Sequence, residues 1–264
     1  WNANNLVNKN GEDFVAWNWK AGGAAVAGGG TAANVQVSAN TEAGFSIVTM
    51  DASAGVRTVG HGLTQAPELI IWKSLTSSGN YWQVLAQAAN NGNGHLGRLA
   101  LQRTDAFLTV SSVWNNTKPT DSVFTLGGSC TEKAVAYCFH SVDGYSKMGS
   151  YVGNGSTTGP TIVTGFRPAW IMFKPTSATG YWYILDNKRS TTNPRNEGLF
   201  PNDSLNEITN TSYNVDFNSN GFQLKNNTIG FNQSGQTYIF MAFAEEALPY
   251  VTRNATNPFG DSSE

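Results

Sequence analysis

Five blocks of sequence occur twice in this chain, in the same order and about 100 residues apart. No other feature constrains the fold as strongly, because a repeat of this kind indicates a tandem duplication of one structural unit. Each copy is about the size of a single β-sandwich domain. The paired blocks are APELIIWK and RPAWIMFK, YWQVL and YWYIL, SVFTL and NGFQL, AVAYCF and YIFMAF, and the dipeptides GF and GY that open the two copies.

The segments between the turns are typical of β-strands. Runs such as GFSIVTM, ELIIWKS and TYIFMAFAE are short and rich in β-branched and aromatic residues, and clusters of Gly, Asn, Ser, Thr and Pro separate them. No window shows the i, i+3, i+4 apolar stripe of an amphipathic helix. The chain is therefore predicted to be all-β, with two tandem β-sandwich (jelly-roll-like) modules and an N-terminal strand.

The repeat also predicts which side chains are buried. Trp82 and Trp182 occupy the same position in the two copies, which indicates core tryptophans. On the opposite face of these strands Gln83 in one copy matches Tyr183 in the other, so this face is expected to be exposed. The runs ELIIWK and WIMFK are apolar on both faces, which predicts central strands covered on each side.

The N-terminal phrase DFVAWNWKAGG resembles the segments that close the two copies, TYIFMAFAEEA and KAVAYCFHSVD. It is therefore interpreted as the last strand of a module, left from or joining a preceding one. Phe14, Val15, Trp17 and Trp19 are too apolar for a free tail. We expect this strand to insert into a sheet or an interface, in its own chain or in a neighbouring subunit, with a disordered tail as the alternative.

These observations divide the chain into five segments. The Gly/Ala-rich stretch AGGAAVAGGGTAAN has the composition of a flexible linker. The expected segments are an N-terminal strand (1–20), a linker (21–42), a first β-sandwich module (43–143), a second β-sandwich module (144–250) and a C-terminal tail (251–264).

Charge is scarce in this chain, and that limits its partners. Only 13% of the residues are charged and the formal net charge is −2. There is no basic patch for nucleic acid, and no run approaches the roughly 18–20 apolar residues of a membrane helix. We therefore expect neither nucleic-acid binding nor membrane insertion. The two cysteines, Cys130 and Cys138, make no disulfide framework, and Cys138 lies in an apolar run typical of a core.

The residues that carry catalysis or bind metals form no convincing constellation. His61, His95 and His140 are not paired at ligand spacing, and we expect structural roles, His61 in a turn and His140 at a strand end. The GNGHLG loop matches G-x-G-x-x-G, but the strand-like RLALQ follows it instead of a helix. No G-x-S-x-G elbow and no pair of carboxylates placed to flank a bond is found. We predict no catalytic, cofactor-binding or metal-binding residue.

Three alternatives stay open at this point. Loop aspartates, Asp51, Asp143 and Asp216, leave room for calcium, although no D-x-[DN]-x-[DN]-G loop is present. A polysaccharide-degrading enzyme would need two acidic residues across a cleft, and the sequence nominates none. Sugar binding is the third alternative. Aromatic side chains beside Asn, Gln and Asp suit stacking on a sugar ring, and the candidates for glycan contact are Tyr181, Tyr183, Trp114 and Tyr213.

Several phrases of the sequence resemble one protein family. VGHGL followed by AP, GSYVGNGSTTGP, and GFRPAW, together with FVAWNWKAGG, are similar to a family of bacteriophage proteins that is widespread in marine phages and labelled tail-fibre or structural. The resemblance covers nearly all of residues 11–247, and Asn18 stands where Cys is common in that family. It implies a virion component built of tandem β modules, and it implies no catalytic residue.

The repeat, the N-terminal strand and this resemblance lead to one expectation of function. We expect a non-enzymatic virion structural protein of a tail fibre, appendage or capsid-exterior fibre, synthesised in the cytoplasm of the bacterial host. Its expected partners are copies of itself, other virion proteins and host-surface glycans, without cofactors. The alternative is a carbohydrate-binding receptor adhesin.

Overall fold

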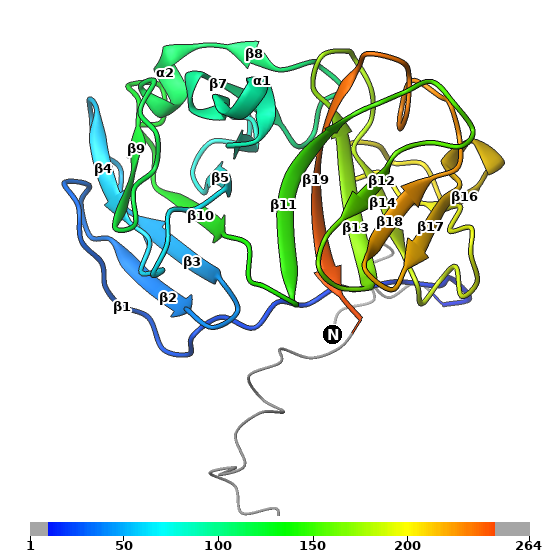
Figure 1. Ribbon diagram of the computed structural model, residues 1–264. Coiled ribbons are helices and arrows are strands. Elements are labelled where there is room, and N and C mark those ends of the chain that lie inside the picture. The colour runs from blue at the N-terminus through cyan, green and yellow to red at the C-terminus, as the bar shows by residue number, and fades with distance from the viewer. Residues whose placement is uncertain (1–9, 246–264) are drawn as a thin grey trace, which may run out of the picture.

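The computed structural model describes residues 10–245, and the protein is all-β, as the sequence predicts. Figure 1 shows two β-rich halves side by side, which we call module 1 and module 2. The chain crosses from one to the other between β10 (Ala134–Phe139) and β11 (Ser146–Val152). The helices are single turns, α1 (Ala89–Gly92), α2 (Ser111–Trp114), η1 (Gly94–Leu96) and η2 (Thr211–Tyr213). None of these described helices has the length and apolarity that a bilayer crossing needs.

The main sheet of module 1 contains β10 and seven further strands. These are β1 (Val26–Ala27), β2 (Gln36–Asn40), β3 (Phe45–Met50), β5 (Leu69–Ser74), β6 (Gln83–Ala86), β7 (Gly97–Ala100) and β8 (Leu108–Thr109). They are hydrogen-bonded in the order β1-β2-β3-β10-β5-β6-β7-β8, and each neighbouring pair is antiparallel. The closing strand of the first copy therefore lies in the middle of the sheet, with both faces available for packing.

A smaller layer covers one face of this sheet. It consists of β4 (Arg57–Gly60), paired with β9 (Val123–Leu126), and of α2. Between the layers lies an apolar core in which Trp72, Trp114 and Phe124 are at most 1% exposed. This layer makes module 1 a sandwich.

Module 2 repeats the plan with a shorter main sheet. Its main sheet has the order β11-β19-β13-β14, with β13 (Pro168–Pro175), β14 (Tyr183–Asp186) and β19 (Thr237–Ala244). A second sheet, in the order β12-β18-β17, covers it and contains β12 (Thr161–Val163), β17 (Val215–Asn218) and β18 (Gly221–Leu224). A two-stranded ribbon pairs β15 (Glu197–Gly198) with β16 (Ile208–Thr209).

The duplication in the sequence is matched by the strand pairing. The order β3-β10-β5-β6 in module 1 corresponds to β11-β19-β13-β14 in module 2. One side-chain bond is repeated as well. The backbone N–H of Trp82 donates to Gln102 Oε1 at 2.9 Å, and that of Trp182 donates to Asn202 Oδ1 at 2.7 Å. Equivalent residues therefore hold equivalent loops in the two copies.

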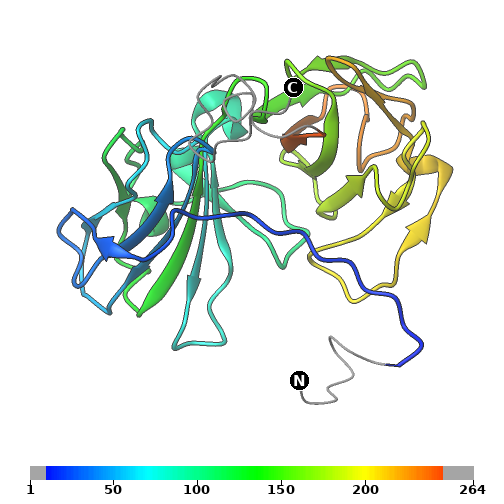
Figure 2. The same ribbon diagram turned by 90° about the horizontal axis from the view of Figure 1, so that it is seen from below.

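The inner faces of the two main sheets pack against each other. This contact, which we call the seam, forms one apolar core from both modules, so the molecule is built in four layers (Figures 1 and 2). It explains why ELIIWK and WIMFK are apolar on both faces: alternate residues point to the module's own core and to the seam. The fully enclosed members of the seam core are Phe45, Leu69, Val84, Ala86, Ala89, Leu99, Phe139, Met148, Trp170, Met172, Trp182, Ile184, Ile239, Met241 and Phe243.

Two expectations about the N-terminal part are corrected by the structure. Residues 21–42 are not a simple linker, because β1 and β2 lie within them and β2 pairs with β3 along its whole length. Residues 13–21, which we call the strap, form no strand: they are extended chain without a ladder in the described part of the protein. The expected boundary near residue 143 falls in the turn between β10 and β11. The expected tail, 251–264, lies outside the described residues.

Candidate functional site: the seam between the two modules

The turn that links the modules is held from both sides. Within it, Val142 and Ser146 exchange backbone hydrogen bonds at 3.1 and 2.9 Å. From module 1, the Glu68 carboxylate accepts the backbone N–H of Ser141 at 2.5 Å. A carboxylate that accepts a backbone N–H makes a charge-assisted bond, which is stronger than a neutral one. The link is therefore a fixed corner and not a hinge.

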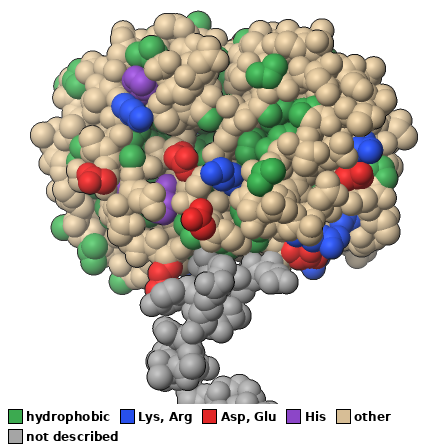
Figure 3. Space-filling model, in the orientation of Figure 1, with side chains coloured by type: hydrophobic (Ala, Val, Ile, Leu, Met, Phe, Trp, Pro, Cys, Tyr) green, Lys and Arg blue, Asp and Glu red, His purple; other side chains and the backbone are tan. Residues whose placement is uncertain are grey.

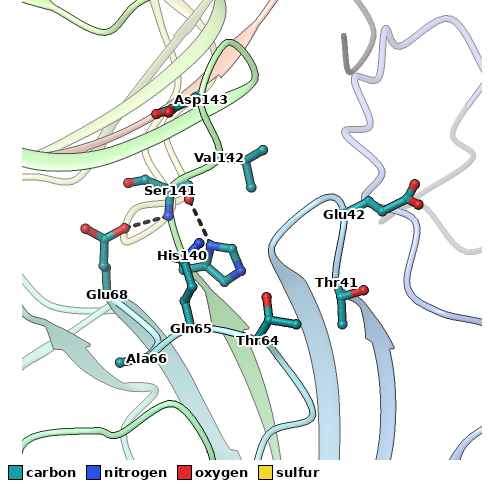
Figure 4. Close-up of a pocket in the computed structure, with 10 residues that line it drawn as sticks. All are labelled: Thr41, Glu42, Thr64, Gln65, Ala66, Glu68, His140, Ser141, Val142 and Asp143. Atoms are coloured by element: carbon teal, nitrogen blue, oxygen red, sulfur yellow. Dashed lines mark hydrogen bonds between the residues drawn. The ribbon is translucent and has the colours of Figure 1, made fainter. Parts of the chain in front are cut away.

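A surface pocket of about 480 Å³ lies beside this corner (Figure 4). Three acidic residues, Glu42, Glu68 and Asp143, line it together with His140. Figure 4 shows that their carboxylates do not converge: Glu68 is turned to the Ser141 backbone, and Glu42 and Asp143 point away from the imidazole. In the described part of the chain, no group of three His, Cys, Asp or Glu side chains could hold a metal ion. The geometry of this pocket supports a structural corner.

His140 is the buried member of this corner. It is 3% exposed, and its Nδ1 lies 2.8 Å from the carbonyl oxygen of Ser141. Since a carbonyl only accepts, Nδ1 carries the proton and Nε2 is the basic nitrogen. Nε2 is buried without a hydrogen-bond partner among the described residues. His140 thus closes the end of β10, as the sequence predicts for a structural histidine at a strand end.

A loop of module 1 reaches across the seam at its other end. Thr104 presents its carbonyl oxygen to Lys174 Nζ at 3.1 Å and to the backbone N–H of Gly180 at 2.8 Å. Lys174 also donates to its neighbour's carbonyl, Pro175 O, at 2.9 Å. The indole N–H of Trp182 donates to the carbonyl of Ala100 at 3.0 Å. Every one of these bonds except the one to Pro175 joins the two modules.

Lys174 is unusual because its ammonium lies inside the protein. The residue is 0% exposed, and burial lowers its pKa to about 8. Its repeat partner, Lys73, is half-buried, donates to Asn80 O at 2.5 Å and lies 5.9 Å from the centre of the Trp82 ring. Both copies thus use the lysine to hold a loop, but only Lys174 holds a loop of the other module.

The strap closes the lower side of the seam, where it runs beneath both modules (Figure 2). Trp19 packs edge-on against Trp170 and Phe243, each with a ring-centre distance of 5.4 Å, and against Phe139 at 6.4 Å. Trp17 lies 6.3 Å from Trp170. These partners come from both modules, so the strap covers the open end of the seam core.

Further contacts hold the two ends of the strap. The guanidinium of Arg189 lies 5.7 Å from the Trp17 ring, and Arg189 itself forms ion pairs with Asp186 at 2.6 Å and Glu207 at 2.5 Å. At the other end Asn40 Nδ2 donates to the carbonyl of Lys20 at 3.1 Å. Asp186 is buried, so its ion pair is an internal support of the strap's docking site.

The family comparison covers this whole arrangement. A family model described as a domain of unknown function, DUF7483, matches residues 1–247. The chain belongs to the DUF7483 family. No curated protein and no solved structure matches the chain. Because the match spans the strap, both modules and the seam, these parts form a single family unit.

In this DUF7483 chain the four strap residues named from the sequence divide into two pairs. Trp17 and Trp19 are half-buried on the seam, whereas Phe14 and Val15 are 53% and 39% exposed. Trp17 and Trp19 share a face because side chains two residues apart on an extended backbone point the same way, whereas Val15 is not part of the seam core. The docking site of the strap could not be predicted from the sequence, because the residues that Trp17 and Trp19 contact lie more than 100 positions away in the chain.

Three of the four aromatic residues proposed for glycan contact lie together, and the fourth does not join them. Trp114 is fully buried in the core of module 1, so its proposed role is wrong. Tyr183 is 7% exposed and packs within the core of module 2, which also corrects the exposed face expected for it. Tyr181 and Tyr213 are half-buried and contact Phe200 at ring-centre distances of 5.4 and 5.9 Å. Tyr181, Tyr183 and Tyr213 thus belong to one aromatic cluster around Phe200.

His61 and the two cysteines have structural roles. His61 is 0% exposed, accepts the N–H of Leu63 on Nδ1 at 3.1 Å, and has Nε2 3.1 Å from the carbonyl of Thr120, which confirms the predicted turn role. Cys130 and Cys138 are buried, and burial raises the pKa of each thiol to about 12. Thiols that stay protonated at neutral pH are poor nucleophiles and poor metal ligands.

The surface of the molecule is largely uncharged. Figure 3 shows a face on which isolated acidic and basic side chains are scattered among neutral polar atoms, with hydrophobic side chains in its central part. Such a surface provides little long-range attraction for charged ligands. Recognition on it depends on hydrogen bonds and shape.

Proposed function

We propose that this DUF7483 protein is a non-enzymatic structural protein of a bacteriophage virion, part of a tail fibre, appendage or capsid-exterior fibre, which acts in assembly and in contact with the host surface. The observation that carries the proposal is the strap. A strand-like segment with two exposed apolar residues, Phe14 and Val15, lies across the seam and pairs with no strand in the described part of the chain. Such a segment is suited to join a sheet of another copy.

The edges of the two main sheets add support. In module 1 the outer edge of β3 is covered by β2. The equivalent strand in module 2 is β11, and no described strand covers its outer edge; Ser150 and Val152 are exposed there. Natural proteins usually cover or blunt such edges, because they pair readily with another chain. The strap resembles β19, which pairs with β11 on its other side, so a second copy's strap has a suitable sequence for this position.

The location in a virion rests on the resemblance to phage tail-fibre and structural proteins given above. Synthesis in the host cytoplasm and release within the particle accord with two free, buried thiols and no disulfide. The neutral polar surface suits contact with glycans of a host cell, which is the function of the alternative, a receptor adhesin.

The assembly half of the proposal is tested by mass. Phe14→Ser with Val15→Ser removes the exposed apolar pair and leaves Trp17 and Trp19 in place, so the fold is expected to survive. Light scattering of the wild type should show an oligomer, and the variant should show the monomer at an unchanged melting temperature. Two results would refute this half. One is a wild type that stays monomeric at concentrations on the order of 10 µM, because a stable assembly has a Kd below this concentration. The other is a variant that remains oligomeric.

The location half is tested on particles. Antibodies against the purified chain should decorate one appendage of the phage in immunogold electron microscopy. Particles that lack the chain by mass spectrometry, prepared from a phage that encodes it, would contradict the virion assignment whatever the light scattering shows.

A further inference from the structure

A second pocket opens on the seam, away from the corner of Figure 4. Its volume is about 280 Å³, near the lower limit of ligand pockets and enough for one small ring. Module 1 supplies residues of α1 and residues in and beside β8, and module 2 supplies residues at the ends of β13 and β19. We call it the amide pocket, and it is lined by Asn90, Asn91, Phe107, Thr109, Thr176, Ser177 and Thr237.

The lining of the amide pocket has a distinct chemistry. None of the seven residues is charged, six carry a carboxamide or hydroxyl group, and one, Phe107, is aromatic. Hydroxyls and carboxamides both donate and accept hydrogen bonds. The set therefore complements a ligand that is itself neutral and rich in hydroxyl groups, while a phosphate or carboxylate would require cationic partners.

The walls of this pocket are fixed by one hydrogen bond across the seam and one within module 2. The backbone N–H of Phe107 donates to Thr176 O at 2.8 Å, and Ser177 Oγ accepts the N–H of Thr237 at 2.8 Å. An added Cβ on Gly97 would lie 2.7 Å from the Phe107 ring, so glycine at this position lets the ring come close to β7. A rigid wall with little to reorganise favours binding.

The polar groups that face the pocket are in part unused. Within the described residues, the side-chain amides of Asn90 and Asn91 and the hydroxyls of Thr109 and Thr237 make no hydrogen bond. By contrast, the hydroxyl of Ser177 is engaged by Gln236 at 2.7 Å. Four hydrogen-bonding side chains on one small pocket are thus available to a ligand.

The two asparagines stand in an uncommon backbone conformation. Asn90 has φ 50° and ψ 48°, Asn91 has φ 55° and ψ 44°, and Gly92 follows with φ 83°. Successive left-handed residues are disfavoured for side chains with a Cβ, and asparagine tolerates them best. Strained positions of this kind gather at ligand sites. The turn presents two neighbouring carboxamides at the rim of the amide pocket.

We propose that the amide pocket binds one residue of a neutral saccharide, with Phe107 against the ring and the carboxamides of Asn90 and Asn91 on its hydroxyl groups. This inference rests on the host-contact half of the proposed function and gives that contact a place and a ligand class. It replaces the aromatic residues named from the sequence, which lie elsewhere. Because the pocket draws on both modules, binding also requires the intact seam.

The test uses the purified full chain and four probes, the methyl glycosides of glucose, galactose, mannose and N-acetylglucosamine. Saturation-transfer NMR is run at probe concentrations on the order of 10 mM, ten times a millimolar Kd. We expect at least one probe to bind. Asn91→Gly keeps the left-handed turn, removes one carboxamide, and should weaken that binding at least about 10-fold.

The chain offers a matched control for this variant. Asn116 also has a left-handed φ of 50°, is exposed, and lies outside the amide pocket. Asn116→Gly should bind as the wild type does, and both variants should melt as the wild type does. No binding of any probe, or equal binding by Asn91→Gly and the wild type, would overturn the inference. Either result is independent of the immunogold and light-scattering tests, which decide the proposed function.

Discussion

The buried ammonium of Lys174 gives the protein a dependence on alkaline pH that can be isolated by one substitution. The folded protein holds this group with a pKa of about 8, because burial disfavours its charge, against 10.5 for the ordinary side chain. Between these two pH values the unfolded chain carries a proton that the folded protein has lost. The contribution of Lys174 to the free energy of unfolding therefore rises as the pH increases through this window.

The magnitude follows from the same two values. Each unit of pKa difference between the folded and unfolded states corresponds to about 1.4 kcal/mol, so the difference at Lys174 amounts to about 3 kcal/mol. Below pH 8 this whole penalty is present, since the ammonium is charged in both states. Above pH 10.5 it is relieved, and the neutral amine still has two N–H donors for the carbonyls of Thr104 and Pro175.

Other groups titrate in this window with the opposite sign. Burial raises the pKa of Cys130, Cys138 and Tyr183 above ordinary values, so these groups ionise first in the unfolded chain and stability falls with pH. The wild type alone therefore gives a mixed curve. The quantity to measure is the difference between the wild type and Lys174→Met, by urea unfolding at intervals from pH 7 to 10.5.

We expect the free energy of unfolding of the wild type, minus that of Lys174→Met, to rise by about 3 kcal/mol between pH 8 and pH 10.5. Lys73→Met makes the same chemical change away from the seam, and it shows what loss of a lysine does elsewhere in the fold. A difference curve for Lys174→Met that stays level from pH 7 to 10.5 would refute the buried, charged lysine and with it the hydrogen-bonded bridge to module 1.

Three further predictions concern the core and the strap. Trp19→Ala should lower the free energy of unfolding by about 2 kcal/mol in urea titrations, because half-burial and three edge-on ring contacts are lost. Burial lowers the pKa of His61, so stability should fall as the pH drops below about 6.5, where the unfolded chain gains a proton first, and the fall should be smaller in His61→Asn. Gly149→Ala should destabilise the protein by about 1–3 kcal/mol, because its Cβ would lie 2.7 Å from the Phe240 ring. Gly128→Ala, with nothing within 4 Å, should lie within about 0.5 kcal/mol of the wild type in the same titration.

Much of the fold could be predicted from the sequence because the duplication repeats its strand signals. Two copies with the same alternation and the same turns predicted the all-β class. The apolar pattern on both faces of the β5 and β13 segments predicted central strands, and both are covered on each side. The sequence did not predict that the other module covers the second face of each sheet, because an apolar pattern indicates that a face is buried but not which segment buries it.

The errors of prediction arose where contacts with distant parts of the chain override the local sequence pattern. Tyr183 matched Gln83, so its face was expected to be exposed, but in module 2 the loops 187–214 and 225–236 fold over that face and bury the ring. Long loops without period carry little signal about where they pack. In the same way β1 lies in a Gly/Ala-rich stretch whose composition favours a linker, yet pairing with β2 overrides that preference.

The candidate sites were beyond the reach of the sequence for a similar reason. The amide pocket combines residues near positions 90, 107, 176 and 237, which come from four separate segments of the chain. Only their arrangement across the seam makes them a set. One local signal was present in the sequence: the run Asn90-Asn91-Gly92 is typical of left-handed backbone.

The single core shared by the two copies also governs which changes the family can tolerate over evolutionary time. Removing either module would expose the apolar seam face of the other module's main sheet to solvent, so we expect the two modules to be inherited together. Residues in the middle of the molecule are bound to partners in both copies and can vary only together. Variation among relatives should therefore gather in the outer loops, which can change without disturbing the seam.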